Sequence, residues 1–191
     1  MKQEHQLIGS LDQELEFPFV ISKLHRDAVA FYRERVEPYM EGIWINYEGY
    51  MKACIIRGDM GDTGLLLVRF PSGGLEDYGL HSHDFSHRQI LVLEGSGTFY
   101  KDGIYTPSLF LKIETAKMNK TEGPIPYSDS DIGKYALEPG YLVQFPKRRI
   151  HNFAAGNEGM LVLSVHRPFI PLDDPRAFTA YPQLQYVSSH Q

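Results

Sequence analysis

Short runs of apolar residues, many of them β-branched, alternate with turn-forming clusters through most of the chain after residue 60. Each run has four to six residues, which suits a strand and is too short for a typical helix. Clusters rich in Gly, Pro, Ser and Asn lie between the runs and mark turns. This pattern predicts an all-β fold with strands at residues 65–70, 90–93, 141–145 and 160–165.

The N-terminal part of the chain has a helical period instead. Ser22 is a suitable N-cap, and we expect a helix from about residue 23 to about residue 40. An amphipathic helix of this kind packs on the rest of its own chain or on a partner subunit. Its expected apolar stripe contains Leu24, Ala28 and Phe31, with Arg35 one turn further, and it is flanked by Val29, Tyr32 and Val36.

Three histidines lie just before the second predicted strand. His81, His83 and His87 fall within seven residues, and a fourth histidine, His151, precedes the last strand. Side chains alternate between the two faces of an extended strand, so the first three histidines share one face in that geometry. Imidazole is a common metal ligand. The sequence therefore indicates a candidate metal site.

The same segment resembles the first motif of the cupin superfamily. That motif is a glycine, then His-x-His, then a glutamate three or four residues on, and then a closing glycine. His81 and His83 fall on the two metal-binding histidines of the family, and Gly95 falls on the closing glycine. The glutamate position holds His87 or Arg88, so no carboxylate stands there.

A second segment resembles the second cupin motif, G-x5-P-x-G-x2-H-x3-N. Gly140, Pro146 and His151 align with its glycine, proline and metal-binding histidine. Arg148 replaces the inner glycine, and Ala155 replaces the asparagine. The two motifs occur in the family's order, and the resemblance covers roughly residues 61–170. It implies a jelly-roll β-barrel with a metal site in its mouth.

Two registers are possible for the glutamate position. Along an unbroken strand from His83, His87 and Gln89 share the ligand face and Arg88 faces away. His87 is then a fourth metal ligand, and Gln89 is a hydrogen-bonding group of the pocket. Counting back from Gly95, the position falls on Arg88, and a bulge or turn would produce that register. Arg88 then points inward as a carboxylate clamp, and three histidines hold the metal.

Tyr100 to Glu138, between the two motifs, is longer than the linker that family members commonly have. We expect a hairpin at residues 106–115 in it, followed by a polar stretch. A loop of this length serves as a lid or a binding element in many proteins. The alternative is a disordered surface insertion.

The implied metal shell consists of imidazole nitrogens, which suit Fe, Zn or Ni, and also Cu, and disfavour Mg and Ca. Neutral histidines leave a divalent ion its full charge, so the site favours an anionic oxygen ligand. We therefore expect a metal-dependent cupin acting on a small oxygen-rich or anionic organic molecule. The expected reaction is that of a dioxygenase or a metal-assisted isomerase, cyclase or lyase. The alternative is a sensor-like cupin that binds a small molecule without catalysis.

Length and composition agree with a single globular domain. The 191 residues are 42% hydrophobic, and we expect one domain over residues 1–191: an N-terminal extension (1–60), a barrel (61–170) and a tail (171–191). The formal net charge of −5 argues against nucleic acid as a partner. The N-terminus lacks the apolar segment of a signal peptide, and no stretch is long and apolar enough for a membrane span. We expect a cytoplasmic protein and, from the family resemblance, a homodimer.

Overall fold

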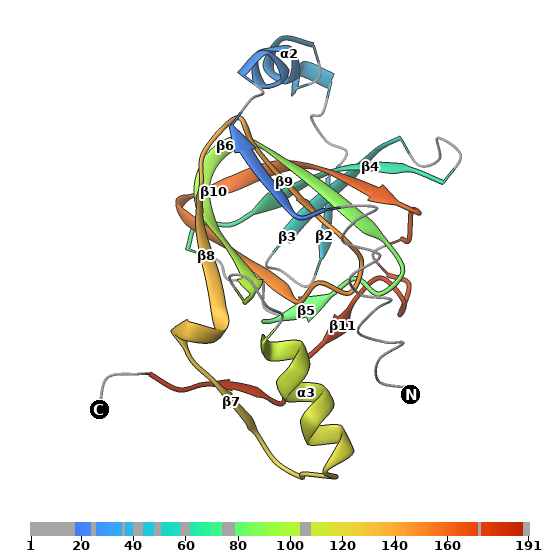
Figure 1. Ribbon diagram of the computed structural model, residues 1–191. Helices are drawn as coiled ribbons and strands as arrows, with labels where there is room; N and C mark the ends of the chain where they lie inside the picture. Colours follow the sequence, from blue (N-terminus) through green and yellow to red (C-terminus); the bar gives the residue numbers. More distant parts are fainter. Residues whose placement is uncertain are drawn as a thin grey trace.

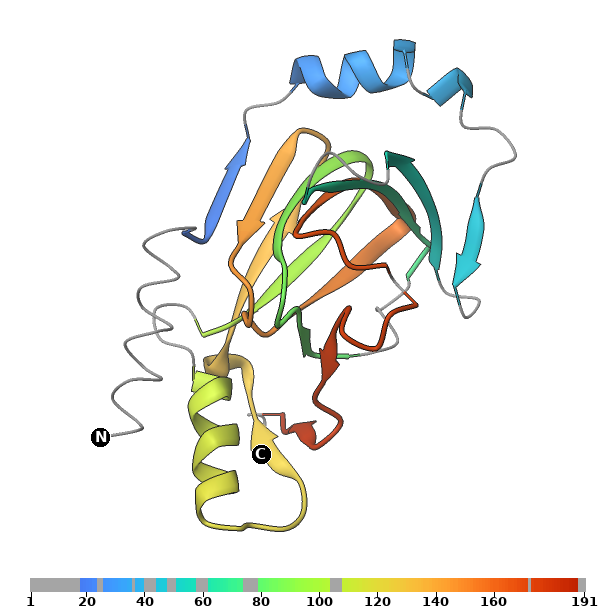
Figure 2. The same cartoon turned by 90° about the vertical axis from the view of Figure 1, so that its right-hand side faces the viewer.

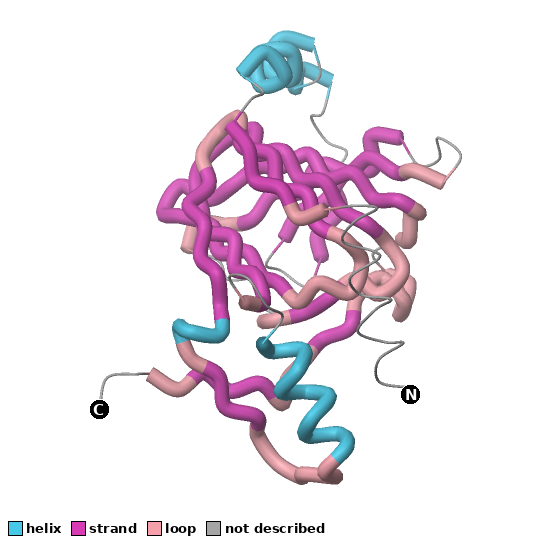
Figure 3. The backbone as a smooth tube through the Cα atoms, in the orientation of Figure 1, coloured by secondary structure: helices cyan, strands magenta, loops and turns pink. Residues whose placement is uncertain are grey.

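The computed structural model describes residues 18–23, 26–35, 37–39, 44–47, 51–57, 62–73, 79–103, 108–171 and 173–188. Most of this part of the chain is strand, and the strands form one strongly curled sheet (Figures 1 and 3). Its strands are β1 Val20–Lys23, β2 Ile45–Tyr47, β3 Met51–Arg57, β4 Gly64–Phe70, β5 His81–Ser82, β6 His87–Asp102, β8 Ile132–Leu137, β9 Tyr141–Phe145, β10 His151–Arg167 and β11 Thr179–Ala180. The other described elements are the helices α2 Arg26–Arg35 and α3 Ser108–Met118, the 3-10 turns η1 Glu37–Tyr39 and η2 Asp129–Asp131, and the parallel strand pair β7 Ile125–Tyr127 and β12 Leu184–Tyr186.

Two long strands, β6 and β10, organise the sheet. The main path runs β1-β9-β6-β10-β4-β3-β2, and every pairing on it is antiparallel. The first half of β6 pairs with β9 and its second half with β8, while β10 pairs with β5 near its start and with β4 near its end. The sheet therefore curls over into a barrel (Figure 2). The four predicted strands lie within β4, β6, β9 and β10 and are confirmed.

The inside of the barrel is an apolar core. Side chains alternate along each strand, so every second residue of β4, β6 and β10 faces inward. The alternate residues of these strands face outward, where α2 covers part of the sheet. The inner cluster consists of Leu66, Val68, Phe70, Ile90, Val92, Phe99, Leu137, Val143, Phe145, Phe153, Ala155, Met160 and Val162.

Gly95 lies in β6 beside an irregularity in the register of this strand with β10. Its φ is +70°, and a Cβ there would overlap the carbonyl oxygen of Gly159. We expect Gly95→Ala to lower the free energy of unfolding by about 2–5 kcal/mol, because a left-handed conformation and a backbone clash add together. Chemical denaturation measures this loss. Gly73→Ala is the matched control: its φ is +64° with open space around the Cβ position, so it should cost only about 1–2 kcal/mol. Equal losses in the two variants would contradict the clash at Gly95.

The N-terminal helix is shorter than predicted and buries a different face. The predicted cap is wrong, because Ser22 lies in β1, whose pairing with β9 delays the start of α2 to Arg26. Val29 and Tyr32, predicted to flank the apolar stripe, are the buried residues, whereas Phe31 of that stripe is 62% exposed. α2 packs on the outer face of the barrel against Leu67, Leu93 and Leu161. The predicted positions Leu24 and Val36 lie outside the described residues.

The described part of the insertion between the motifs is folded. The predicted hairpin at 106–115 is wrong: α3 occupies 108–118, and β7, η2 and β8 follow it. Leu109 and Ile113, one helical turn apart, are the buried residues of α3, and they pack with Leu80, Ile132 and Ile150. The insertion is therefore a second small core at one end of the barrel (Figure 1).

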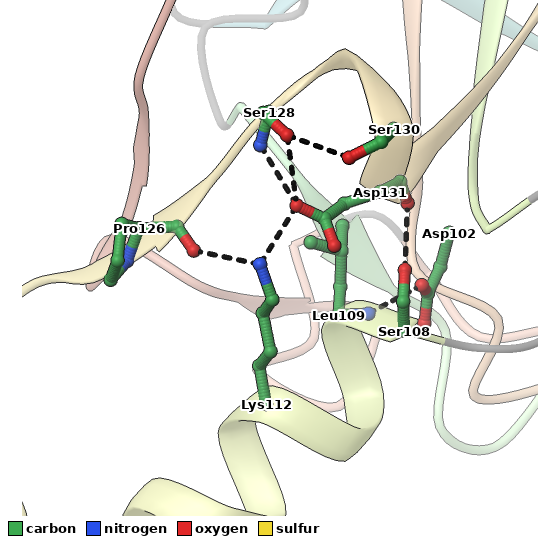
Figure 4. Close-up of polar contacts among 8 residues, drawn as sticks. All are labelled: Asp102, Ser108, Leu109, Lys112, Pro126, Ser128, Ser130 and Asp131. Atoms are coloured by element: carbon green, nitrogen blue, oxygen red, sulfur yellow. Dashed lines mark hydrogen bonds and ion pairs between the residues drawn. The ribbon is translucent and has the colours of Figure 1, made fainter. Parts of the chain in front are cut away.

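Polar contacts join α3 to the segment before β8 (Figure 4). Lys112 Nζ lies 2.8 Å from the Asp131 carboxylate and donates to the Pro126 carbonyl at 3.1 Å. The Ser128 backbone N–H donates to the same carboxylate at 2.9 Å, and Ser108 Oγ donates to the Asp131 carbonyl at 3.0 Å. These bonds tie the helix to η2 and fix its orientation.

Asp102, at the end of β6, caps the first turn of α3. Its carboxylate accepts the backbone N–H groups of Leu109 at 2.7 Å and Phe110 at 3.0 Å (Figure 4 shows the first of these bonds). Burial nevertheless raises the pKa of Asp102 from its ordinary 3.8 to about 6. A raised carboxyl pKa means that protonation favours the folded state, so this contribution to stability is full below pH 3.8 and is lost as pH rises through about 6.

We expect Asp102→Asn to remove that pH dependence, because the amide does not ionise. Between pH 4 and pH 7 the wild-type protein should lose stability relative to the Asn variant. Urea unfolding of both proteins at several pH values measures the difference. Parallel curves across this range would show that burial does not control the ionisation of Asp102.

Candidate metal centre

Three of the predicted histidines come together at the mouth of the barrel. His81 of β5 pairs directly with His151 at the start of β10, and His83 follows in the loop after β5. One ring nitrogen from each lies within 4.8 Å of the others, and bonds of about 2 Å to a common ion would draw these nitrogens closer together. The ring centroids are 4.5 Å apart for His81 and His151, and 5.1 Å apart for the other two pairs.

Backbone carbonyls determine which nitrogen of each ring carries its proton. A carbonyl oxygen only accepts, so a ring Nδ1 beside one must carry the hydrogen, and Nε2 then keeps its lone pair. The same arrangement orients many metal-binding histidines. The three contacts are His81 Nδ1 with Gly79 O at 3.1 Å, His83 Nδ1 with Ala177 O at 2.6 Å, and His151 Nδ1 with Arg149 O at 2.8 Å.

The donor set fits a transition metal. His151 is 1% exposed, and its Nε2 is buried without a hydrogen-bond partner in the structure, a costly state for a polar atom unless something binds there. Burial, with nearby positive charge as a smaller cause, holds the pKa of His83 and His151 well below the ordinary value of 6.5. Neutral imidazole is the form that binds a metal. The described residues thus offer three imidazole nitrogen ligands, and burial keeps two of these rings, His83 and His151, neutral.

Arg88 enters the same region from β6. It is 1% exposed, and its Nη2 lies 3.1 Å from His83 Nδ1. A guanidinium only donates, and this Nδ1 donates to Ala177, to which the distance is shorter. The contact between Arg88 and His83 is therefore a close approach of a cation to the ligand ring rather than a hydrogen bond.

His87 lies outside the three-histidine group. Its Nδ1 accepts the backbone N–H of Lys147 at 3.3 Å. β5 ends at Ser82 and β6 begins at His87, so alternation counted from His83 does not continue across the loop between them. The register counted back from Gly95 describes the structure, and it turns Arg88 inward.

Gln89, expected in the pocket, is on the other face of β6 from Arg88 and Ile90. Its amide donates to Gln144 Oε1 at 2.7 Å, and the Gln144 amide donates to the Pro18 carbonyl at 3.0 Å. This placement keeps Gln89 out of the histidine cluster.

The C-terminal segment contributes to the site, which the sequence did not indicate. β11 pairs with β5, and Ala177 supplies the carbonyl that holds His83. The Phe178 ring meets the His81 ring edge-on at 6.0 Å, and the Tyr181 hydroxyl lies 2.9 Å from Ser82 Oγ. We name residues 177–181 the C-terminal strap. Phe178 and Tyr181 are the sequence features that could have indicated a role for this segment, but nothing in their spacing connects them to the histidines.

Two rows of side chains line the barrel mouth. On one wall His151 is flanked by its strand partners His81 and Lys101, and Lys101 Nζ lies 4.4 Å from the centre of the Phe19 ring. On the facing wall Arg88 is flanked by Phe145 and His166. The two walls are in contact through the Phe145 and His151 rings, whose centroids are 4.2 Å apart. Lys101 and Arg88 are both buried, so cationic side chains border the histidine cluster.

Among the described helices, none has the length and apolar character required to cross a membrane.

No protein-family model matches the sequence, and no curated protein matches it either. Similarity is found among solved structures, of which three are representative. KdgF from Halomonas sp. shares 17% identity, with 66% of this chain and 88% of that chain covered and a TM-score of 0.48.

The capsular polysaccharide assembling protein CapF from Staphylococcus aureus shares 13% identity over 72% of this chain, with a TM-score of 0.50. Oxalate decarboxylase from Lactobacillus farciminis shares 15% identity over 72% of this chain, with a TM-score of 0.47. The chain spans about a third of the length of these two proteins, 31% and 32% respectively. Identities this low speak for the fold alone. The curled antiparallel sheet and the similarity to CapF, at a TM-score of 0.50, together show that the chain has the cupin jelly-roll fold.

Proposed function

We propose that this protein is a metal-dependent cupin enzyme in which His81, His83 and His151 hold one divalent transition metal ion. The observation that carries the proposal is the cluster of two buried histidines and one half-buried histidine, whose Nδ1 atoms face carbonyls and whose Nε2 atoms keep their lone pairs. Iron, zinc and nickel are the candidate ions, since all three accept imidazole ligands. When bound, the ion supplies Lewis-acid activation of a substrate oxygen.

The surroundings favour a small anionic, oxygen-rich substrate. Three neutral ligands leave a divalent ion its full charge, and Arg88 adds a second positive group beside His83. A guanidinium binds a carboxylate through two parallel hydrogen bonds. Arg88 therefore orients an acid group at the site, while Phe145 and Phe178 shield that group from water. Dioxygenase, isomerase, cyclase and lyase reactions on such molecules are the reaction classes proposed.

Elemental analysis of purified protein tests the metal. We expect about one equivalent in the wild type and in His87→Ala, and none in His81→Ala/His83→Ala, because only the last variant loses nitrogens of the cluster. His87→Ala is the matched control, since His87 neighbours the cluster in sequence but lies outside it. The three-histidine proposal would be contradicted if only the His87→Ala variant lost its metal, or if no reconstituted sample contained metal.

The enzyme assignment also needs a position open to substrate. Cobalt-loaded protein should change its visible spectrum when propionate is added, because an incoming oxygen ligand alters the coordination of the ion. An unchanged spectrum at saturating propionate would move the protein to the class of non-catalytic binding barrels. The expected homodimer is a separate prediction, which light scattering of the purified protein tests.

A further inference from the structure

His166 lies inside the barrel and has no part in the histidine cluster. It is the inner-face residue of β10 that pairs with Arg88 on one side and with Gly64 on the other. Ser164, two residues earlier on the same face, is buried as well. Along this stretch of β10 the inner face is otherwise apolar, with Met160 and Val162 in the core cluster. Two polar residues in succession thus interrupt an apolar surface next to Arg88.

The hydrogen bonding of His166 is incomplete. The residue is 3% exposed, its Nε2 lies 2.8 Å from Ser164 Oγ, and its Nδ1 is buried without a hydrogen-bond partner. Beyond Gly64, the Phe169 ring fills the space that a Cβ would need, and it packs 6.1 Å from the His166 ring. Of the two strand partners of His166, Arg88 is therefore the polar one.

A buried Nδ1 without a partner destabilises a fold unless a ligand or water completes it. The serine hydroxyl can donate to Nε2 or accept from it, so Nδ1 can serve as a donor or as an acceptor. An adaptable polar atom of this kind suits an oxygen group of either type on a bound molecule.

Resting on the proposed function, we infer that His166 is a specificity-determining residue: its Nδ1 hydrogen-bonds a second oxygen group of the acid that Arg88 orients at the metal. The site would then select small acids that carry a further hydroxyl, carbonyl or carboxyl group over acids that carry none. The physical basis is the row Phe145, Arg88, His166, in which an anion clamp and an unsatisfied imidazole are neighbours on paired strands.

Calorimetric titration of zinc-loaded protein tests the inference with three acids of equal length, propionate, 3-hydroxypropionate and malonate. In the wild type we expect the second oxygen group to raise affinity about tenfold for at least one of the latter two. In His166→Phe, which keeps an aromatic ring at the position, the three acids should bind within about twofold of one another. The metal content should be unchanged in this variant.

An independent measurement uses the wild type alone. The His166 side-chain nitrogen resonances should shift on addition of the preferred acid and remain in place with propionate. An equal preference in the wild type and His166→Phe, or static His166 resonances, would overturn the inference while leaving the proposed function intact. If propionate and both other acids fail to bind the zinc-loaded protein, the proposed function itself fails.

Discussion

Replacing Arg88 by methionine is expected to weaken binding of propionate to the zinc-loaded protein by about 100-fold. The guanidinium beside His83 is a buried group that can form paired, charge-assisted hydrogen bonds to a carboxylate. Methionine fills similar space without any donor. Calorimetric titration of the two zinc-loaded proteins measures the change, and metal content should stay near one equivalent in both.

The same substitution should leave the fold as stable as before, or more stable. A buried charge is costly, and replacing it with an apolar side chain of similar volume is often neutral or stabilising. Arg69→Met is the matched control, because Arg69 is on the outside of the barrel, 3.5 Å from Glu94. Unchanged propionate affinity in Arg88→Met, or an equal loss in Arg69→Met, would contradict the role of Arg88.

Ending the chain after Asp173 is expected to lower zinc affinity by about 10–100-fold. This truncation removes the C-terminal strap, and with it the Ala177 carbonyl that fixes the tautomer of His83 and the Phe178 ring that packs on His81. Both ligand rings then gain freedom that metal binding must restrict. Competition with a chromophoric chelator measures the affinity.

A chain ending after Gln183 is the control for that truncation. It lacks β12 but keeps the strap and the contact between Tyr181 and Ser82, so it should bind zinc as the full chain does. Circular dichroism of both shortened proteins separates loss of the site from loss of the fold. Equal zinc affinity in two folded truncations would show that the strap does not position the histidines.

Local pattern predicted four of the described strands correctly and the helices poorly, for physical reasons. β4, β6, β9 and β10 bury one face each, so their period is present in the sequence itself. The start of α2 depends instead on the pairing of β1 with β9, over 100 residues away in the sequence. α3 depends on the Asp102 carboxylate, which lies six residues before the helix begins. Contacts with residues outside the helix produce no periodic pattern of apolar residues within the helix itself.

The candidate site divides in the same way. The motif spacing identified His81, His83 and His151, which the structure brings together. It could not choose between His87 and Arg88, because the choice depends on where β5 ends and β6 begins. The hydrogen bond from His83 Nδ1 to the Ala177 carbonyl could not be predicted, because every residue type has a backbone carbonyl and the sequence does not mark the one that is used.

The core of the insertion is joined to the candidate metal centre by directly bonded neighbours in the chain. Leu80 and Ile150, which pack with Leu109 and Ile113 of α3, each immediately precede a histidine of the candidate metal centre. The helix therefore packs against the residues that lead into both β5 and β10. A change of side-chain volume on this surface helix would be transmitted to the spacing of two ligands, so a variant can lose its metal although the altered residue never meets the ion. The insertion, which a minimal barrel lacks, thus supports two of the three histidines of the candidate metal centre.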